Sequence, residues 1–196
     1  LKSRGVQVIA PDSKVANGDL PALPAAAWGA LQNQDLWTIC DIGGGELGLR
    51  PLGRFVESAA SRASSVLFLV NPYRPGYRTL DEMEKNVVHL QKYSALEVTQ
   101  LVANPHLIHE TTPEVFHRGL EMVKELGQRL ELPVAFAMAA EELAGSLGDL
   151  GGVPVLSIRR FWRTPWKFGL NPDVPTVDDA LHAASKQLRF GAFQKL

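Results

Sequence analysis

The sequence predicts an α/β domain in three layers, in which a mostly parallel sheet is covered by helices on both faces. Short apolar runs alternate with longer amphipathic segments, as in sheets whose parallel strands are joined by helices. The runs at 65–70 and 133–138 are almost entirely apolar, which is typical of strands that are covered on both faces. The amphipathic segments begin at residues that commonly cap helices.

Length and composition are those of a globular domain. The chain has 196 residues, of which 45% are hydrophobic and 21% are charged, so we expect one domain over residues 1–196. The formal net charge of −1 gives no reason to expect nucleic acid or an anionic membrane as a partner. No continuous apolar run is long enough to cross a bilayer. Cys40 is the only cysteine, which predicts a reducing, cytoplasmic location.

Apolar runs that end at turn-forming residues mark the expected strands. Pro11 closes the first run, and two Asn-Pro pairs, Asn71-Pro72 and Asn104-Pro105, stop the third and fourth. By alternation along the second run, the Cys40 thiol is predicted to be buried and to face away from the Asp41 side chain. The expected strands are 6–10, 36–41, 65–70, 99–103, 133–138 and 154–158.

Two of the expected helices carry clear start signals. Thr79 and Glu82 have the spacing of a capping box, ahead of apolar residues at helical spacing. Thr112 is the expected N-cap of the second helix, and Pro113 its first residue. Further helices are expected at 24–31, 52–59 and 177–188. The segment Leu1–Gly5 has the pattern of a helix end, so we expect residues upstream of it.

The end of the second expected strand carries the first candidate for ligand chemistry. Ligands of open parallel sheets bind at the carboxyl ends of the strands. Asp41 stands at such an end, and Gly43, Gly44 and Gly45 follow it. A carboxylate at this place can hold Mg²⁺ through water, and glycine N–H groups can face a phosphate. The alternative is a tight turn with an exposed acid.

The next two strand ends also carry polar residues. The segment 71–78 places two arginines beside two tyrosines, which suits an anion or a partner protein, or else a solvated loop. Asn104 could contact the edge of a base with its amide, or simply end the strand. His106 and His109 have no further His or Cys nearby, and we do not expect them to bind a metal.

The segment 159–168 combines four cations with four aromatic residues and no acid. We expect its aromatic residues to pack over the sheet edge while its cations stay solvated. A surface for a protein partner is the alternative, and nucleic acid is the least favoured occupant.

Several of these pieces, in this order, resemble the P-loop nucleotide-binding proteins of the MinD/ParA/CobQ group, the SIMIBI class. The segment 41–44 is similar to the Walker B strand with its Asp-x-x-Gly switch, and 70–75 and 102–105 are similar to one ATP-binding branch. The resemblance implies that ATP binds with Mg²⁺, held through water by Asp41. It also implies that Gly43 and Gly44 meet the terminal phosphate. Asn104 would contact the base, and the backbone at Ala139 and Ala140 would flank the adenine.

One departure from the family pattern is decisive for activity. The chain contains no Gly-Lys-Ser/Thr loop. Family order places that loop upstream of Leu1, so we expect an N-terminally truncated domain. As it stands, this domain is expected not to hydrolyse ATP. The resemblance implies that the complete protein is a slow nucleotide switch that can form a homodimer. One rival is a non-catalytic interaction module that uses the segment 159–168. A second rival is a flavodoxin-like enzyme that uses the turn at 43–45.

Overall fold

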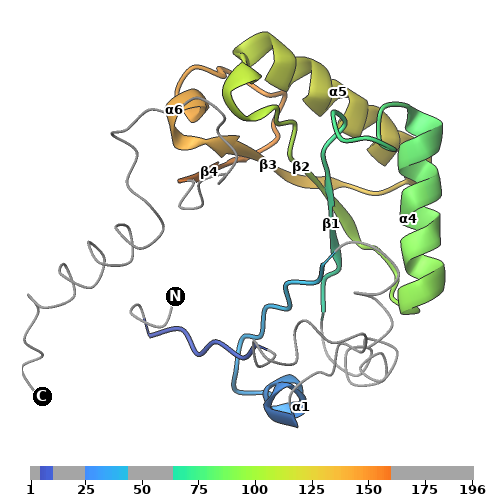
Figure 1. Ribbon diagram of the computed structural model, residues 1–196, viewed down its shortest axis with the longest axis vertical. Helices are drawn as coiled ribbons and strands as arrows, with labels where there is room; N and C mark the ends of the chain where they lie inside the picture. Colours follow the sequence, from blue (N-terminus) through green and yellow to red (C-terminus); the bar gives the residue numbers. More distant parts are fainter. Residues whose placement is uncertain (1–4, 11–24, 44–63, 160–196) are drawn as a thin grey trace, which may run out of the picture. The chain divides into compact units, whose positions relative to one another are not determined.

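The computed structural model describes residues 5–10, 25–43 and 64–159, coloured in Figure 1. The helix expected at 24–31 is confirmed as α1 (Ala25–Gln32). The helices expected at 52–59 and 177–188 lie outside the described residues, as does the segment 160–168.

In the described residues, four strands form one parallel sheet. The strand order equals the chain order, and every neighbouring pair is parallel (Figure 1). The expected strands at 65–70, 99–103, 133–138 and 154–158 are thereby confirmed, with shifts at their ends. The strands are β1 (Leu67–Val70), β2 (Gln100–Ala103), β3 (Val134–Ala140) and β4 (Val155–Ile158). The chain therefore has an α/β fold with a parallel sheet.

β2 is the most deeply buried of these strands. Leu101, Val102 and Ala103 are fully buried. β1 alternates instead, with Phe68 and Val70 buried and Leu67 and Leu69 exposed. β1 pairs with β2 along its full length, in a register that aligns its last residue with the last residue of β2. The two strands therefore end side by side.

The helix α4 (Leu80–Ser94) joins β1 to β2 and has the predicted capping box. The Thr79 hydroxyl accepts a hydrogen bond from the N–H of Glu82, and the Glu82 carboxylate accepts one from the N–H of Thr79. These bonds satisfy donors that a helix start leaves without intrahelical partners. The helix ends at Ala95, which adopts the left-handed conformation with φ of 54°.

The helix α5 (Pro113–Leu130) joins β2 to β3 and also begins as predicted. The Thr112 hydroxyl accepts from the N–H of Val115, and Pro113 stands in the first turn. Arg129 near its end forms ion pairs with Asp81 and Glu84 of α4, each at 2.7 Å. Its buried face consists of Phe116, Gly119, Leu120, Val123, Leu126 and Gly127.

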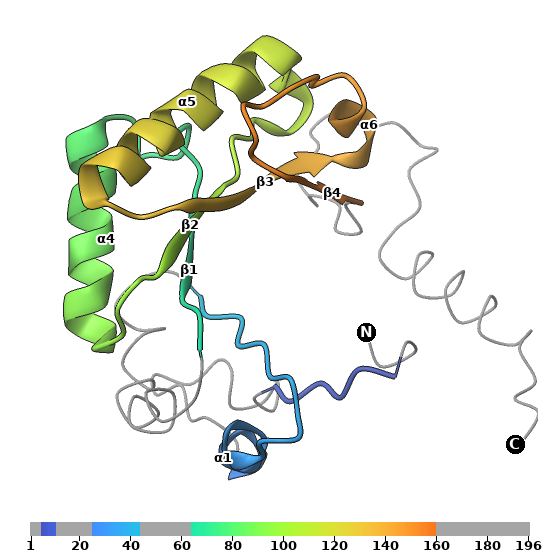
Figure 2. The ribbon, with the colours of Figure 1, turned by 180° about the vertical axis from the view of Figure 1, so that it is seen from behind.

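Both helices pack on the same face of the sheet (Figures 1 and 2). Consecutive parallel crossovers share one hand, so helices that follow strands in simple order lie on one side. Met83 and Val87 of α4 join the buried face of α5 in one core cluster with Phe68 and Val70 of β1. The expectation of helices on both faces is thus met for one face by the part of the chain that the structure describes.

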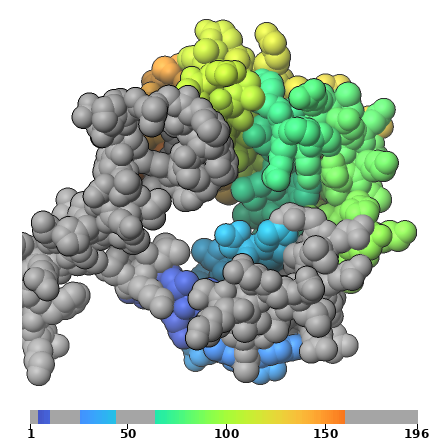
Figure 3. Space-filling view, in the orientation of Figure 1, coloured from blue at the N-terminus to red at the C-terminus, as the bar shows by residue number. Residues whose placement is uncertain are grey.

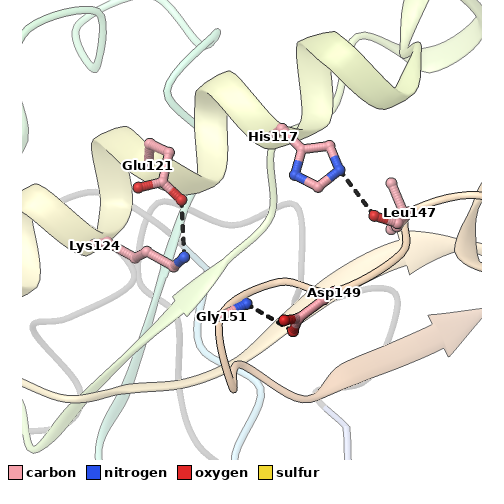
Figure 4. Close-up of polar contacts among 6 residues, drawn as sticks. All are labelled: His117, Glu121, Lys124, Leu147, Asp149 and Gly151. Carbon is pink, nitrogen blue, oxygen red and sulfur yellow. Dashed lines mark hydrogen bonds and ion pairs between the residues drawn. The ribbon is translucent and has the colours of Figure 1, made fainter.

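A glycine-rich loop, rather than a long helix, leads from β3 to β4. It follows the short helix α6 (Glu141–Ala144) and buries Leu147 and Leu150 in the core. His117 Nε2 of α5 donates to the carbonyl of Leu147 at 2.8 Å (Figure 4). The N–H of Gly151 donates to Asp149 Oδ1 at 3.0 Å. The first bond ties the loop to α5, and the second lies within the loop.

The strands expected at 6–10 and 36–41 are wrong, because neither segment is a strand in the structure. Apolar alternation indicates strand propensity, but a strand also needs a hydrogen-bonded neighbour. The side chains of Trp37 and Ile39 are almost fully exposed instead. Cys40 is exposed too, which contradicts the predicted buried thiol. Its burial had been derived from a strand that does not form.

None of the helices in the described ranges is both long enough and apolar enough to cross a membrane.

Candidate ligand site at the carboxyl edge of the sheet

The same dipeptide, Asn-Pro, follows β1 and β2. Asn71-Pro72 and Asn104-Pro105 stand one residue beyond the aligned ends of the two strands. Both prolines are fully buried, which fixes the backbone at this edge. The N–H of Asn104 donates to the carbonyl of Val70 at 2.8 Å. The two asparagines therefore lie next to each other, at the edge where parallel sheets bind ligands.

The Asn71 side chain is used to join two loops. Its Nδ2 donates to the carbonyl of His106 at 3.0 Å, across 35 residues of sequence. Its Oδ1 accepts from the N–H of Tyr73 at 3.1 Å and from the N–H of His106 at 3.4 Å. In the space-filling view, the green residues that follow β1 lie against the yellow-green residues that follow β2 (Figure 3). The amide of Asn71 is therefore committed to the fold.

The Asn104 side chain is in the opposite situation. It is half-buried, and its amide makes no hydrogen bond within the described part of the chain. No fully buried side-chain N or O atom in that part lacks a partner, so the amide of Asn104 reaches solvent. An amide offers two donors and one carbonyl acceptor to a ligand. Of the two neighbouring asparagines, Asn104 is the one with free hydrogen-bonding capacity.

Gly119 lets α5 approach these loops closely. A Cβ at this position would overlap the Cβ of Pro105 and would lie 3.0 Å from the ring of Tyr73. The Tyr73 hydroxyl donates to the carbonyl of Val115, one turn earlier in α5. Burial raises the pKa of the Tyr73 phenol, an effect that the nearby Arg118 partly offsets. The first turns of α5 thus contact Pro105 directly and reach the other Asn-Pro segment through Tyr73, the residue that follows it.

The end of β3 lies beside the same edge. Ala137 is aligned with Ala103, so Ala139 and Ala140 extend past the end of β2. Ala139 is buried and Ala140 is exposed. Ala140 is therefore the exposed residue at this end of β3.

Glu141, the first residue of α6, forms a two-pronged ion pair with Arg159 beyond β4. The nitrogen–oxygen distances are 2.7 and 2.9 Å. The hydrogen bond from Arg159 lowers the pKa of the Glu141 carboxyl. Arg159 is the one residue of the segment 159–168 that the structure describes, and its charge is matched within the chain.

His106 takes part in hydrogen bonds within the loop after β2. Its Nδ1 accepts from the N–H of Ile108 at 2.7 Å, and Ile108 has a φ of 59°. Thr111 Oγ1 accepts from the N–H of Leu107 at 2.8 Å and donates to the carbonyl of Ile108. In the described ranges no three His, Cys, Asp or Glu side chains are grouped as metal ligands would be.

The remaining predicted site residues are not brought to this edge by a strand. Asp41 and Gly43 are exposed and lie in a segment without strand structure, so the prediction that Asp41 ends a strand is wrong. Gly44 lies outside the described residues. Of the predicted site residues, Asn104, Ala139 and Ala140 therefore lie at the ends of strands that the structure contains.

A shallow hollow of about 310 Å³ is lined by Gln91, Ala95, Leu96 and Glu97. It lies where α4 ends ahead of β2, which is the amino edge of the sheet. Because ligands of parallel sheets bind at the opposite edge, we do not assign a function to it.

Sequence reasoning did not identify the role of Asn71. It treated both Asn-Pro pairs as strand stops, and it singled out Asn104 as a possible base contact from its place at a strand end and from the resemblance. The repetition of Asn-Pro after two apolar runs was the available signal. Which of the two amides is used within the fold depends on the path of the loop after β2, and the sequence pattern does not specify that path.

Searches against protein-family models, curated proteins and solved structures found no match to this chain. Its class therefore rests on its own structure, which is an α/β fold with a parallel sheet and a polar carboxyl edge.

Proposed function

We propose that this chain belongs to an ATP-binding domain of the MinD/ParA/CobQ type, and that the carboxyl edge of β2 and β3 contacts the adenine base. The observation that carries the proposal is the Asn104 amide, which makes no hydrogen bond within the described residues, beside an Asn71 amide that bonds to Tyr73 and His106. It is supported by the place of Asn104 at the end of a parallel strand, where such sheets bind nucleotides.

The chemistry of the edge suits a purine base. An asparagine amide can donate to one ring nitrogen and accept from an exocyclic amino group, which is the pattern that adenine offers. The exposed Ala140 at the end of β3 has a small side chain, against which a flat ring could lie. A rigid edge loses little conformational entropy when it binds a ligand.

The part of the proposal that concerns Mg²⁺ and the phosphates rests on the resemblance of 41–44. Mg²⁺ would neutralise phosphate charge and would be held through water by Asp41, and Gly43 and Gly44 would face the terminal phosphate. The described residues at the edge suit the base, whereas Asp41 is not at a strand end. We therefore assign no catalytic step to these residues. ATP hydrolysis would require a phosphate-binding loop from outside this chain.

NMR titration of the ¹⁵N-labelled chain with AMP tests the base site directly. We expect the side-chain amide resonances of Asn104 to shift, and the affinity of Asn104→Ala to fall on the order of tenfold, the equivalent of one hydrogen bond. Gln128→Ala is the matched control, because it removes an exposed amide from the far end of α5. It should leave the affinity unchanged.

Calorimetry with ATP and Mg²⁺ tests the phosphate side. It should be carried out on this chain and on a version extended by the residues encoded upstream. Tighter binding by the extended version supports a separate phosphate-binding loop. Absence of binding by both folded proteins would refute the nucleotide proposal and favour the interaction module.

A further inference from the structure

The segment 104–106 is attached to the end of β1 at two points. At its start, the N–H of Asn104 donates to the carbonyl of Val70 at 2.8 Å. At its end, both backbone groups of His106 bond to the Asn71 side chain. The segment that contains Asn104 is therefore attached to two consecutive residues, Val70 and Asn71. The attachment to Val70 is a backbone hydrogen bond, and the attachment to Asn71 is through its side chain.

We infer that Asn71 is a positioning residue, which holds Asn104 in place for the ligand bound at the carboxyl edge. This inference rests on the proposed function, because the ligand is the adenine base proposed above. We place Asn71 outside the contact with the ligand, because its Oδ1 accepts from Tyr73 and His106 and one N–H of its Nδ2 donates to His106.

The other supports of Asn104 do not replace Asn71. Pro105 is buried against Gly119 of α5, and this contact fixes the distance between the loop and the helix. The strand contact to Val70 fixes the N–H of Asn104. Neither contact restrains His106, whose peptide groups set the direction in which the chain leaves Asn104. Without Asn71, both bonds that tie His106 to the end of β1 are lost, so the chain that leaves Asn104 can shift relative to β1.

The loss of these bonds would add a conformational-entropy cost to ligand binding. A binding group that is already fixed pays its conformational entropy on folding, whereas a mobile group pays it on binding. A site must also hold its groups to within about 0.5 Å of the productive geometry. We therefore expect Asn71→Ala to weaken AMP binding on the order of tenfold, the lower end of the range for removing the hydrogen-bond partner of a metal ligand.

The chain offers a matched control in Asn86. Its Nδ2 donates to the carbonyls of Gly76 and Glu82, at 2.7 and 2.9 Å, and so ties the β1–α4 loop to α4. Asn86→Ala removes the same kind of side chain from α4, where it bonds to the same β1–α4 loop but not to the segment 104–106. A purely structural role for Asn71 would make the two variants behave alike.

The experiment measures AMP affinity by NMR titration for the full chain and for Asn71→Ala, Asn71→Asp and Asn86→Ala. Asn71→Asp keeps the acceptor for Tyr73 and His106 but loses the donor, so we expect its affinity to be intermediate. This variant replaces Asn71→Ala in the comparison if Asn71→Ala does not fold. Hydrogen exchange at the N–H of His106 should accelerate in Asn71→Ala and stay unchanged in Asn86→Ala.

Each outcome is decisive. The inference is supported if the folded Asn71 variants bind AMP more weakly and Asn86→Ala stays within about twofold of the unmodified chain. Asn86 is expected to have no effect because substitutions at sites without shared partners act independently. Equal affinity of the folded Asn71 variants and the unmodified chain overturns it and leaves the proposed function standing. Equal weakening by Asn86→Ala overturns it as well. If AMP does not shift the Asn104 amide of the unmodified chain, the proposed function fails and this inference fails with it.

Discussion

Gly119→Ala tests the contact between α5 and the two Asn-Pro segments. The added methyl group would overlap the Cβ of Pro105, a ring atom in a fully buried residue, and would lie 3.0 Å from the Tyr73 ring. Pro105 would have to move by about 1 Å before the two carbons reach ordinary contact distance. Because a proline ring cannot rotate away, the backbone of the loop must shift.

The expected loss of stability follows from two opposing terms. Overpacking costs up to about 3 kcal/mol, and we take this upper end because two neighbours must move. Replacing a helical glycine with alanine returns about 1 kcal/mol of helix propensity. The free energy of unfolding should therefore fall by about 2 kcal/mol.

Urea denaturation followed by far-UV circular dichroism measures this difference. Gly145→Ala is the control, because a Cβ there meets no atom within 4 Å and its backbone has a φ of −71°. That variant should stay within about 0.5 kcal/mol of the unmodified chain. A Gly119→Ala protein as stable as the unmodified chain, or more stable, would refute the close packing of α5 on the loops.

Three further changes have expected outcomes in the same assay. Thr79→Ala should lower the free energy of unfolding by about 1 kcal/mol, since it removes the N-cap of α4, and no loss would contradict the capping box. Ala95→Gly should raise it by about 0.5 kcal/mol, because Ala95 has a φ of 54°, and a decrease would contradict the left-handed cap. Tyr73→Phe should lower it by about 1 kcal/mol at pH 7, through the lost bond to Val115. Because burial raises the pKa of Tyr73, the unmodified chain should lose stability as the pH rises above 10, and Tyr73→Phe should lose less; identical alkaline profiles would contradict this.

Local signals in the sequence were sufficient for α1, α4 and α5 and for the strands of the described sheet. Thr79 with Glu82, and Thr112 with Pro113, define helix starts through contacts between residues close in sequence. Such contacts form in the same way whatever the rest of the chain does. The predicted strand at 36–41 failed because a strand depends on a partner from elsewhere in the chain.

The candidate site shows the same division. The sequence by itself determined that Asn71 and Asn104 end strands, because Asn-Pro after an apolar run stops a strand through local backbone sterics. Only the tertiary structure decided that the Asn71 amide is used across 35 residues while the Asn104 amide stays free. It also decided that Pro105 packs against α5 at Gly119, where there is no room for a side chain. The physical reason is that hydrogen bonds and close contacts between distant segments depend on how loops and helices pack, and no local pattern of residues encodes that arrangement.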